Sequence, residues 1–140
     1  MTELTDAGVL LRMAYNAMQE AGVDADAVLA EVGMNKSVLN QQDLRTPHDA
    51  QEWFWEAVEK VSGDPHIGLH LGDHVPIFKG QVLEYLFLSS PTFGDGLRRA
   101  LNYQRLLSDA FRADLVVEGD DAYLRQIAWA PRLFHLNECV

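Results

Sequence analysis

Apolar side chains recur every three or four residues over the first two-thirds of the chain, a spacing that places them on one face of an α-helix. This pattern predicts a first helix that follows Thr5 as its cap and ends at Gly22. It also predicts a short second helix between Asp24 and Gly33. A third short helical piece is expected around residues 36–40.

The clearest helix signal lies in the segment TPHDAQEWFWEAVEKVSG, residues 46–63. We expect Thr46 to cap this helix and Pro47 to take its first position, where a missing N–H costs nothing. Gly63 is expected to end it. Its apolar positions are predicted to form one buried stripe: Ala50, Trp53, Phe54, Ala57, Val58 and Val61.

The segment GDPHIGLHLGDHV, residues 63–75, is predicted to be a helix that Asp64 caps. Ile67 and Leu71 would lie on its buried face, and its glycines suggest close packing of another backbone. Three histidines fall on the opposite face at intervals of four residues: His66, His70 and His74.

The pattern changes in the last third of the chain. Residues 82–88, VLEYLFL, are apolar on nearly all sides, and we favour a helix because a strand would need close turns at both of its ends. Thr92 is predicted to cap a helix that continues to Leu107, and residues 112–129 read as a β-hairpin. The predicted fold class is therefore α+β, with a mostly helical N-terminal two-thirds packed on a small antiparallel β-hairpin or sheet.

Length and charge narrow the possible functions. A chain of 140 residues suits one compact domain, and its 21 acidic against 11 basic side chains give a net charge of −10. Such a surface repels phosphate backbones, so the chain itself is not expected to bind nucleic acid, and it has no apolar run long enough to span a bilayer. A single cysteine and the absence of a signal peptide predict a cytoplasmic protein.

The histidine stripe is the main candidate for metal chemistry. A physiological zinc site needs three or four ligands held by further contacts, and no Cys or Glu stands at ligand spacing here. A solvated polar face is the favoured interpretation, so we predict no metal and no cofactor. The chain also lacks a G-x-S-x-G turn, an H-E-x-x-H helix and a phosphate-binding loop, so we do not expect an enzyme.

Two motifs resemble the N-terminal effector domain of AraC-type bacterial transcription regulators, in the branch often called arabinose-binding-like. The first is G-D-P-x-x-G-L-x-L-G, and the second is S-P-T-[LF]-x-x-[AG]-L with a downstream tyrosine. The matching residues are Gly63, Asp64, Pro65, Gly68, Leu69, Leu71 and Gly72, then Gly80, Ser90, Pro91, Thr92, Phe93, Leu97 and Tyr103. The histidines of the first motif are not characteristic of the family, and Glu84 stands where the family often has a small residue.

The resemblance implies that residues 1–140 are a single N-terminal sensor domain of a longer regulator. DNA would be bound only through a C-terminal helix-turn-helix module that this chain lacks. Such a domain implies an unidentified small-molecule effector, and we expect a homodimer. Two alternatives remain: a protein interaction or dimerisation module without a small ligand, and a metal-responsive sensor that uses His66, His70 and His74.

A ligand pocket is expected where the 82–88 segment, the 92–107 helix and the hairpin meet. Aromatic side chains would form its walls, and a carboxylate or a guanidinium would contact polar groups of the ligand. The predicted ligand-binding residues are Glu84, Tyr85, Phe87, Tyr103, Arg105 and Trp129.

Overall fold

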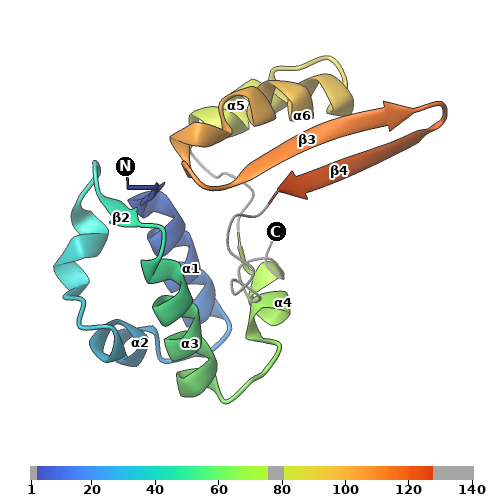
Figure 1. Cartoon of the computed structure of the whole chain (residues 1–140). Coiled ribbons are helices and arrows are strands. Elements are labelled where there is room, and N and C mark those ends of the chain that lie inside the picture. The colour runs from blue at the N-terminus through green and yellow to red at the C-terminus, as the bar shows by residue number, and fades with distance from the viewer. Residues whose placement is uncertain (1–2, 76–80, 128–140) are drawn as a thin grey trace. The chain divides into compact units, whose positions relative to one another are not determined.

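The structure, a computed structural model, describes residues 3–75 and 81–127, and Figure 1 shows their path. These residues form six α-helices, two short 3-10 helices and two antiparallel sheets of two strands each. The predicted α+β class is confirmed. The described residues divide into two compact units, one within residues 3–75 and the other within residues 81–127.

The first unit is helical, with one short pair of strands. Its elements are β1 (Thr5–Ala7), α1 (Gly8–Glu20), α2 (Ala25–Glu31), the 3-10 helix η1 (Lys36–Asn40), β2 (Arg45–Pro47), α3 (Ala50–Ser62) and α4 (Ile67–Gly72). Helix α2 packs against α3, and α1 contacts both α2 and α4. The predicted stops are confirmed, since Gly63 follows α3 with φ of 69° in the left-handed region, where glycine has no Cβ penalty.

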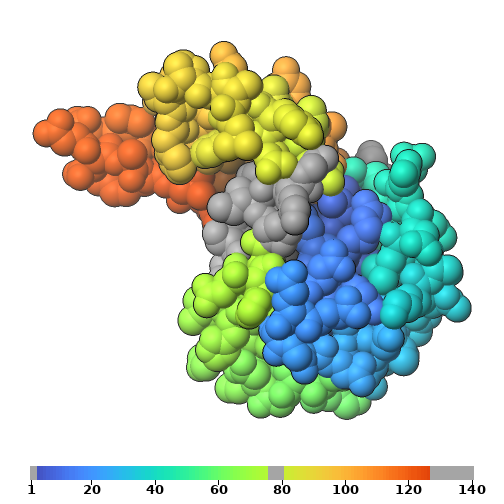
Figure 2. All heavy atoms as spheres, turned by 180° about the vertical axis from the view of Figure 1, so that it is seen from behind, coloured from blue at the N-terminus to red at the C-terminus, as the bar shows by residue number. Residues whose placement is uncertain are grey.

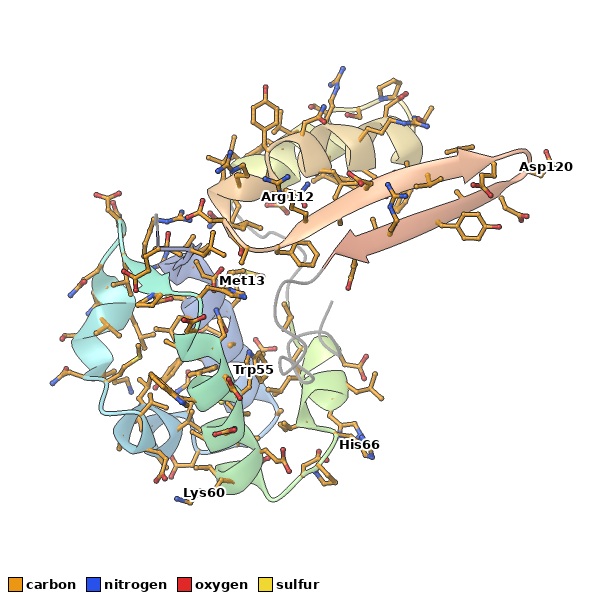
Figure 3. All side chains as sticks on the ribbon, viewed as in Figure 1. Met13, Trp55, Lys60, His66, Arg112 and Asp120 are labelled. Carbon is orange, nitrogen blue, oxygen red and sulfur yellow. The ribbon has the colours of Figure 1, made fainter. Side chains whose placement is uncertain are left out.

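The core of this unit comes from one face of each helix. Met18 of α1, Val28 of α2, Val58 of α3 and Leu71 of α4 are fully buried at the centre. Each large aliphatic side chain removed from water in this way contributes about 1.5–3 kcal/mol to folding. Trp55 of α3, which Figure 3 labels, also belongs to this core and is 6% exposed.

The pairing of β1 with β2 was not expected from the sequence. Thr46 and Pro47 do not begin α3, because they lie in β2 opposite Asp6 and Thr5, and the helix starts at Ala50. Thr5 likewise lies in β1 and does not cap α1. The guanidinium of Arg45 donates to the hydroxyl of Thr5 at 2.7 Å, which holds the two strands together across forty residues of chain.

A buried polar cluster fastens this strand pair to α3. The Asp6 carboxylate, 2% exposed, accepts a hydrogen bond from Nδ1 of His48 at 2.8 Å and another from Nε2 of Gln51 at 3.0 Å. Because buried polar groups are costly without partners, these bonds fix the start of α3 against β1.

Helix α4 has the predicted division of faces. Ile67 and Leu71 are 3% and 0% exposed, whereas Leu69 on the other side is 59% exposed. The helix begins at Ile67 and not at Pro65, because the Asp64 carboxylate caps a preceding turn through the backbone N–H of His66 at 2.9 Å.

The second unit contains two helices and a β-hairpin, with α5 packed on α6 and α6 on β3. Its elements are α5 (Val82–Leu88), α6 (Phe93–Asn102), the 3-10 helix η2 (Gln104–Leu106), β3 (Arg112–Glu118) and β4 (Asp121–Ile127). The helical interpretation of residues 82–88 is confirmed, and the Thr92 hydroxyl caps α6 by accepting from the N–H of Asp95 at 3.1 Å. Helix α6 ends at Asn102, so it is shorter than predicted, and η2 follows it.

Two close contacts define the packing of this unit. Gly96 of α6 lies against α5, where a Cβ atom would come within 2.7 Å of the carbonyl oxygen of Phe87. Gln104 of η2 binds both backbone groups of Ala113 in β3, accepting from its N–H at 2.6 Å and donating to its C=O at 3.1 Å. The two helices therefore approach closely at Gly96, and the Gln104 side chain joins η2 to the hairpin.

The hairpin turns tightly and extends beyond the helices. Glu118 pairs with Asp121, so the connecting loop consists of Gly119, with φ of 63°, and Asp120, which Figure 3 shows at the tip. Ala113 is buried beside α6, but Val117 and Leu124 further along are 53% and 47% exposed. Figure 2 shows this end of the hairpin extending past α5 and α6.

Candidate functional site

The predicted ligand-binding residues that the structure describes lie on the second unit. Tyr85 of α5 is 66% exposed, and Tyr103 at the end of α6 is 53% exposed. Phe87 is partly buried, and its ring meets the edge of the Phe93 ring at a centroid distance of 5.2 Å.

The polar members of the set lie on the same unit. Glu84 is partly buried in the first turn of α5, and Arg105 is exposed in η2. Trp129 lies outside the described residues. Both tyrosines and Arg105 are exposed to solvent, and the role of the whole set in ligand binding stays a prediction.

One face of α5 exposes an apolar stripe to solvent. Val82, Tyr85 and Leu88 are 54%, 66% and 68% exposed, and their spacing of three residues places them on one side of the helix. The opposite side is covered, since Leu83 is 2% exposed. A helix that is apolar on both sides is typical of an element with a second packing partner.

Two of the three histidines contact different carboxylates, and they do not converge on one point. His70 donates from Nδ1 to the Asp64 carboxylate at 2.5 Å, whereas His74 faces Glu20 of α1 at 3.9 Å. His66 lies on the surface, as Figure 3 shows. Within residues 3–75 and 81–127, no group of three His, Cys, Asp or Glu side chains is arranged to hold a metal ion.

The Asp64 carboxylate is stabilised in its ionised form. The hydrogen bond from His70, and after it the bond from the backbone N–H of His66, holds the pKa of Asp64 below its ordinary value of 3.8. The first family motif therefore contains a local electrostatic pair that fixes the turn before α4.

A groove of about 440 Å³ lies between α2 and α3, and we call it the α2–α3 groove. Its floor is apolar: Phe54 and Ala57 are 7% and 4% exposed, and Val32 and Met34 pack against the same core. Its remaining lining residues are Glu31, Ala50, Trp53, Glu56 and Lys60.

Charged side chains form part of the edge of this groove. The ammonium of Lys60 binds the Glu31 carboxylate, and Figure 3 shows Lys60 at the end of α3 on the side of α2. Glu56 is exposed on the same edge. A second hollow of about 410 Å³ shares Glu56 and Lys60 with the groove and is also lined by Glu59, Gly63 and Pro65.

Trp53 is the residue of this groove that sequence reasoning placed wrongly. The sequence pattern predicts it in the buried stripe of α3, which is wrong because Trp53 is 67% exposed, whereas Trp55 is buried. Positions 53 and 55 flank the centre of the apolar face at Phe54 from opposite sides, about 100° away in each direction. Helical spacing alone does not decide which flank is covered, so the groove gave no clear signal in the sequence.

Comparison with known sequences decides the family. The family described as "Arabinose-binding domain of AraC transcription regulator, N-term" matches residues 22–140. The chain belongs to this family. The match confirms the resemblance carried by the two motifs, and it assigns this AraC-type domain to a family of regulator domains and not to an enzyme family.

A regulator of known role has a similar sequence. The ornithine utilization regulator of Pseudomonas aeruginosa is 28% identical over 112 residues, which are 80% of this chain. The alignment spans only 33% of that regulator's length. Among the described residues of this AraC-type domain, no helix is long and apolar enough to cross a membrane.

Proposed function

We propose that this chain is the effector-sensing part of a longer cytoplasmic transcription regulator. A small molecule bound to it would change the activity of a DNA-binding module outside these 140 residues. The family match over residues 22–140 carries this proposal. The net charge of −10 supports it, because such a chain is poorly suited to hold DNA itself.

The effector must distinguish between two arrangements of the regulator. A ligand that binds both arrangements equally tightly shifts neither of them, whatever its affinity. In the first unit, the α2–α3 groove offers a hollow of about 440 Å³, within the range of about 300–1,000 Å³ that small-molecule sites occupy. The alternative location is the set predicted from the sequence, which comprises Glu84, Tyr85, Phe87, Tyr103 and Arg105 of the second unit and Trp129, which the structure does not describe.

A thermal-shift screen of the 140-residue protein tests the sensing function. Ornithine and arabinose are the first compounds to try, because they occur in the names of the relative and of the family. A true effector at 100 times its dissociation constant should add about 2.7 kcal/mol to stability. If amino acids, amines, sugars and fatty acids all leave the melting temperature unchanged, a domain that senses small molecules is contradicted.

A second candidate function is dimerisation, and the apolar stripe of α5 favours it. Val82, Tyr85 and Leu88 stand together on one exposed face, which a second copy of the chain would cover. We expect sedimentation equilibrium to show a dimer for the wild type and a monomer for Tyr85→Glu. Asn102→Glu is the control, since it adds the same charge at an exposed position of α6. Equal association of both variants would argue against this interface.

A further inference from the structure

We propose that the α2–α3 groove binds a small organic cation, with the ligand's apolar body on the floor and its positive nitrogen between Trp53 and Glu56. The groove joins an exposed indole, a covered apolar floor and a carboxylate-rich edge in one hollow of about 440 Å³. The floor selects an apolar body, and the indole and the carboxylates both select positive charge.

The floor selects an apolar body. Phe54 and Ala57 are almost fully buried, and Val32 and Met34 close the α2 side of the hollow. A hydrocarbon chain or ring placed here would lose contact with water on the side that faces the floor. Affinity from this part follows the apolar area that the ligand covers.

Trp53 adds a preference for positive charge. This residue is 67% exposed although it borders the hollow, so a ligand in the groove can reach its side chain. The negative face of an indole attracts a cation within about 6 Å of its centre, and tryptophan is the most effective residue for this contact.

The carboxylates of the edge favour the same charge. Glu56 follows Trp53 by three residues, so both side chains project from neighbouring positions on one face of α3. Lys60 is bound to Glu31, so an anionic ligand would have to compete with that carboxylate for the ammonium. Two glutamates and one lysine line the groove, which leaves its edge negative and disfavours an anion.

The inference that the groove is the effector's site rests on the proposed function. If both hold, the effector is an amine with an apolar body. Cation binding by the groove does not depend on that function. A bound cation would contact both α2 and α3, so it would favour the arrangement in which these two helices are packed as observed.

Three probes with the same phenyl body separate charge from apolar contact: phenethylamine, 2-phenylethanol and phenylacetate. Each is titrated into the ¹⁵N-labelled 140-residue protein, and the indole N–H signal of Trp53 and the amides of α2 and α3 are followed by NMR. We expect saturable shifts at these positions with phenethylamine and binding at least about fivefold weaker with the alcohol. Phenylacetate should produce no shift there.

Matched variants locate the contacts. Trp53→Ala should weaken phenethylamine binding by about fivefold, and Trp53→Phe should recover part of it. Glu56→Gln should weaken it by about threefold, because an exposed carboxylate contributes modestly. The control Glu118→Gln removes the same charge from β3 and should leave the affinity unchanged. Both tryptophan changes are at an exposed side chain, so the fold should be retained.

Several results would overturn the inference. Equal affinity for the amine and the alcohol would remove charge recognition, and shifts confined to other residues would remove the site. Equal losses in Glu56→Gln and Glu118→Gln would reduce the effect to net charge. If phenethylamine fails while the thermal-shift screen finds another effector, the groove proposal falls and the sensing function stands.

Discussion

At the residue scale, a few buried polar contacts are expected to contribute strongly to the stability of the first unit. Asp6 is a carboxylate with almost no exposure, and it joins β1 to the beginning of α3 through His48 and Gln51. Such a group stabilises the protein only while all its partners are in place. If the carboxylate is removed, each buried donor has no hydrogen bond to the protein and none to water.

Asp6→Ala should therefore destabilise the protein by about 2–3 kcal/mol, since it leaves the buried His48 donor without its acceptor. Urea unfolding followed by NMR signals of the first unit measures this change. The control is Asp49→Ala, at an exposed aspartate whose side chain makes no capping bond to α3, and it should cost less than about 0.5 kcal/mol. Similar costs for both variants would show that the cluster has no special role.

A second prediction concerns the titration of Asp64. The pKa of Asp64 is lower in the folded protein than its ordinary value of 3.8, so its ionised carboxylate, which accepts bonds from His70 and from the backbone of His66, stabilises the fold above that pH. This contribution is lost as the pH falls through the lowered pKa. In His70→Ala, the pKa of Asp64 should rise towards its ordinary value, which a ¹³C carboxylate titration would detect.

The control for this titration is His74→Ala, because His74 faces Glu20 and not Asp64. It should leave the Asp64 titration as it is in the wild type. An unchanged pKa in His70→Ala would mean that the backbone bond from His66 accounts for the whole effect.

At the element scale, the contact between α5 and α6 depends on the absence of a side chain. The carbonyl oxygen of Phe87 approaches Gly96 so closely that a Cβ atom would lie 2.7 Å from it. Backbone atoms cannot move aside as easily as the end of a flexible side chain does, so a larger residue would separate the two helices.

Gly96→Ala should accordingly destabilise the second unit by about 1–3 kcal/mol through overpacking. Gly94→Ala in the same helix is the matched control, because its nearest neighbour is the end of the Arg98 side chain at 3.5 Å. That change should be neutral or stabilising by up to about 1 kcal/mol, as alanine favours helix. Hydrogen exchange at amides of α6 measures both, and equal protection in the two variants would refute the close contact.

The elements that the sequence predicted correctly are those defined by neighbouring residues. Gly63 ends α3, Thr92 caps α6, and Gly119 turns the hairpin through preferences that act within a few positions. The strand pair β1–β2 was missed because its hydrogen bonds join residues forty positions apart, such as Thr5 and Arg45. Tertiary contact overrode a strong local capping signal at Thr46.

The candidate site was harder to predict than the elements for the same reason. The α2–α3 groove exists because α2 packs at a particular place on α3, and neither helix shows this in its own pattern. The predicted ligand residues rest on composition and on their place in the chain; Tyr85 and Tyr103 are exposed, and their role in ligand binding stays a prediction. Trp53 is exposed because its side of α3 is not covered by another described element of the first unit. Only the packing of the whole unit determines which side is covered.

At the scale of the whole molecule, the excess of acidic side chains sets how the chain meets other polyanions. With 21 acidic and 11 basic residues, it has few cations with which to displace the counterions of a duplex. Poor binding of duplex DNA by this chain is therefore expected, and the proposed separation of sensing from DNA binding requires it.

We predict that the 140-residue protein binds duplex DNA more weakly than about 10⁻⁴ M at about 0.15 M salt, measured by fluorescence anisotropy. Lowering the salt should not strengthen binding, because weaker screening increases the repulsion between two negative surfaces. An affinity that rises steeply as salt is removed would indicate a basic binding face and would contradict the separation of the two roles.

The arrangement of α3 also gives the molecule its own optical reporters. Trp53 and Trp55 are separated by one residue, yet they are 67% and 6% exposed. Among the described residues, the indole nitrogen of Trp55 is buried with no hydrogen-bond partner, so this ring should emit at a short wavelength and resist quenching by acrylamide. Trp53 should emit at a longer wavelength and be quenched readily. A single helix therefore reports on solvent at one indole and on the interior at the other.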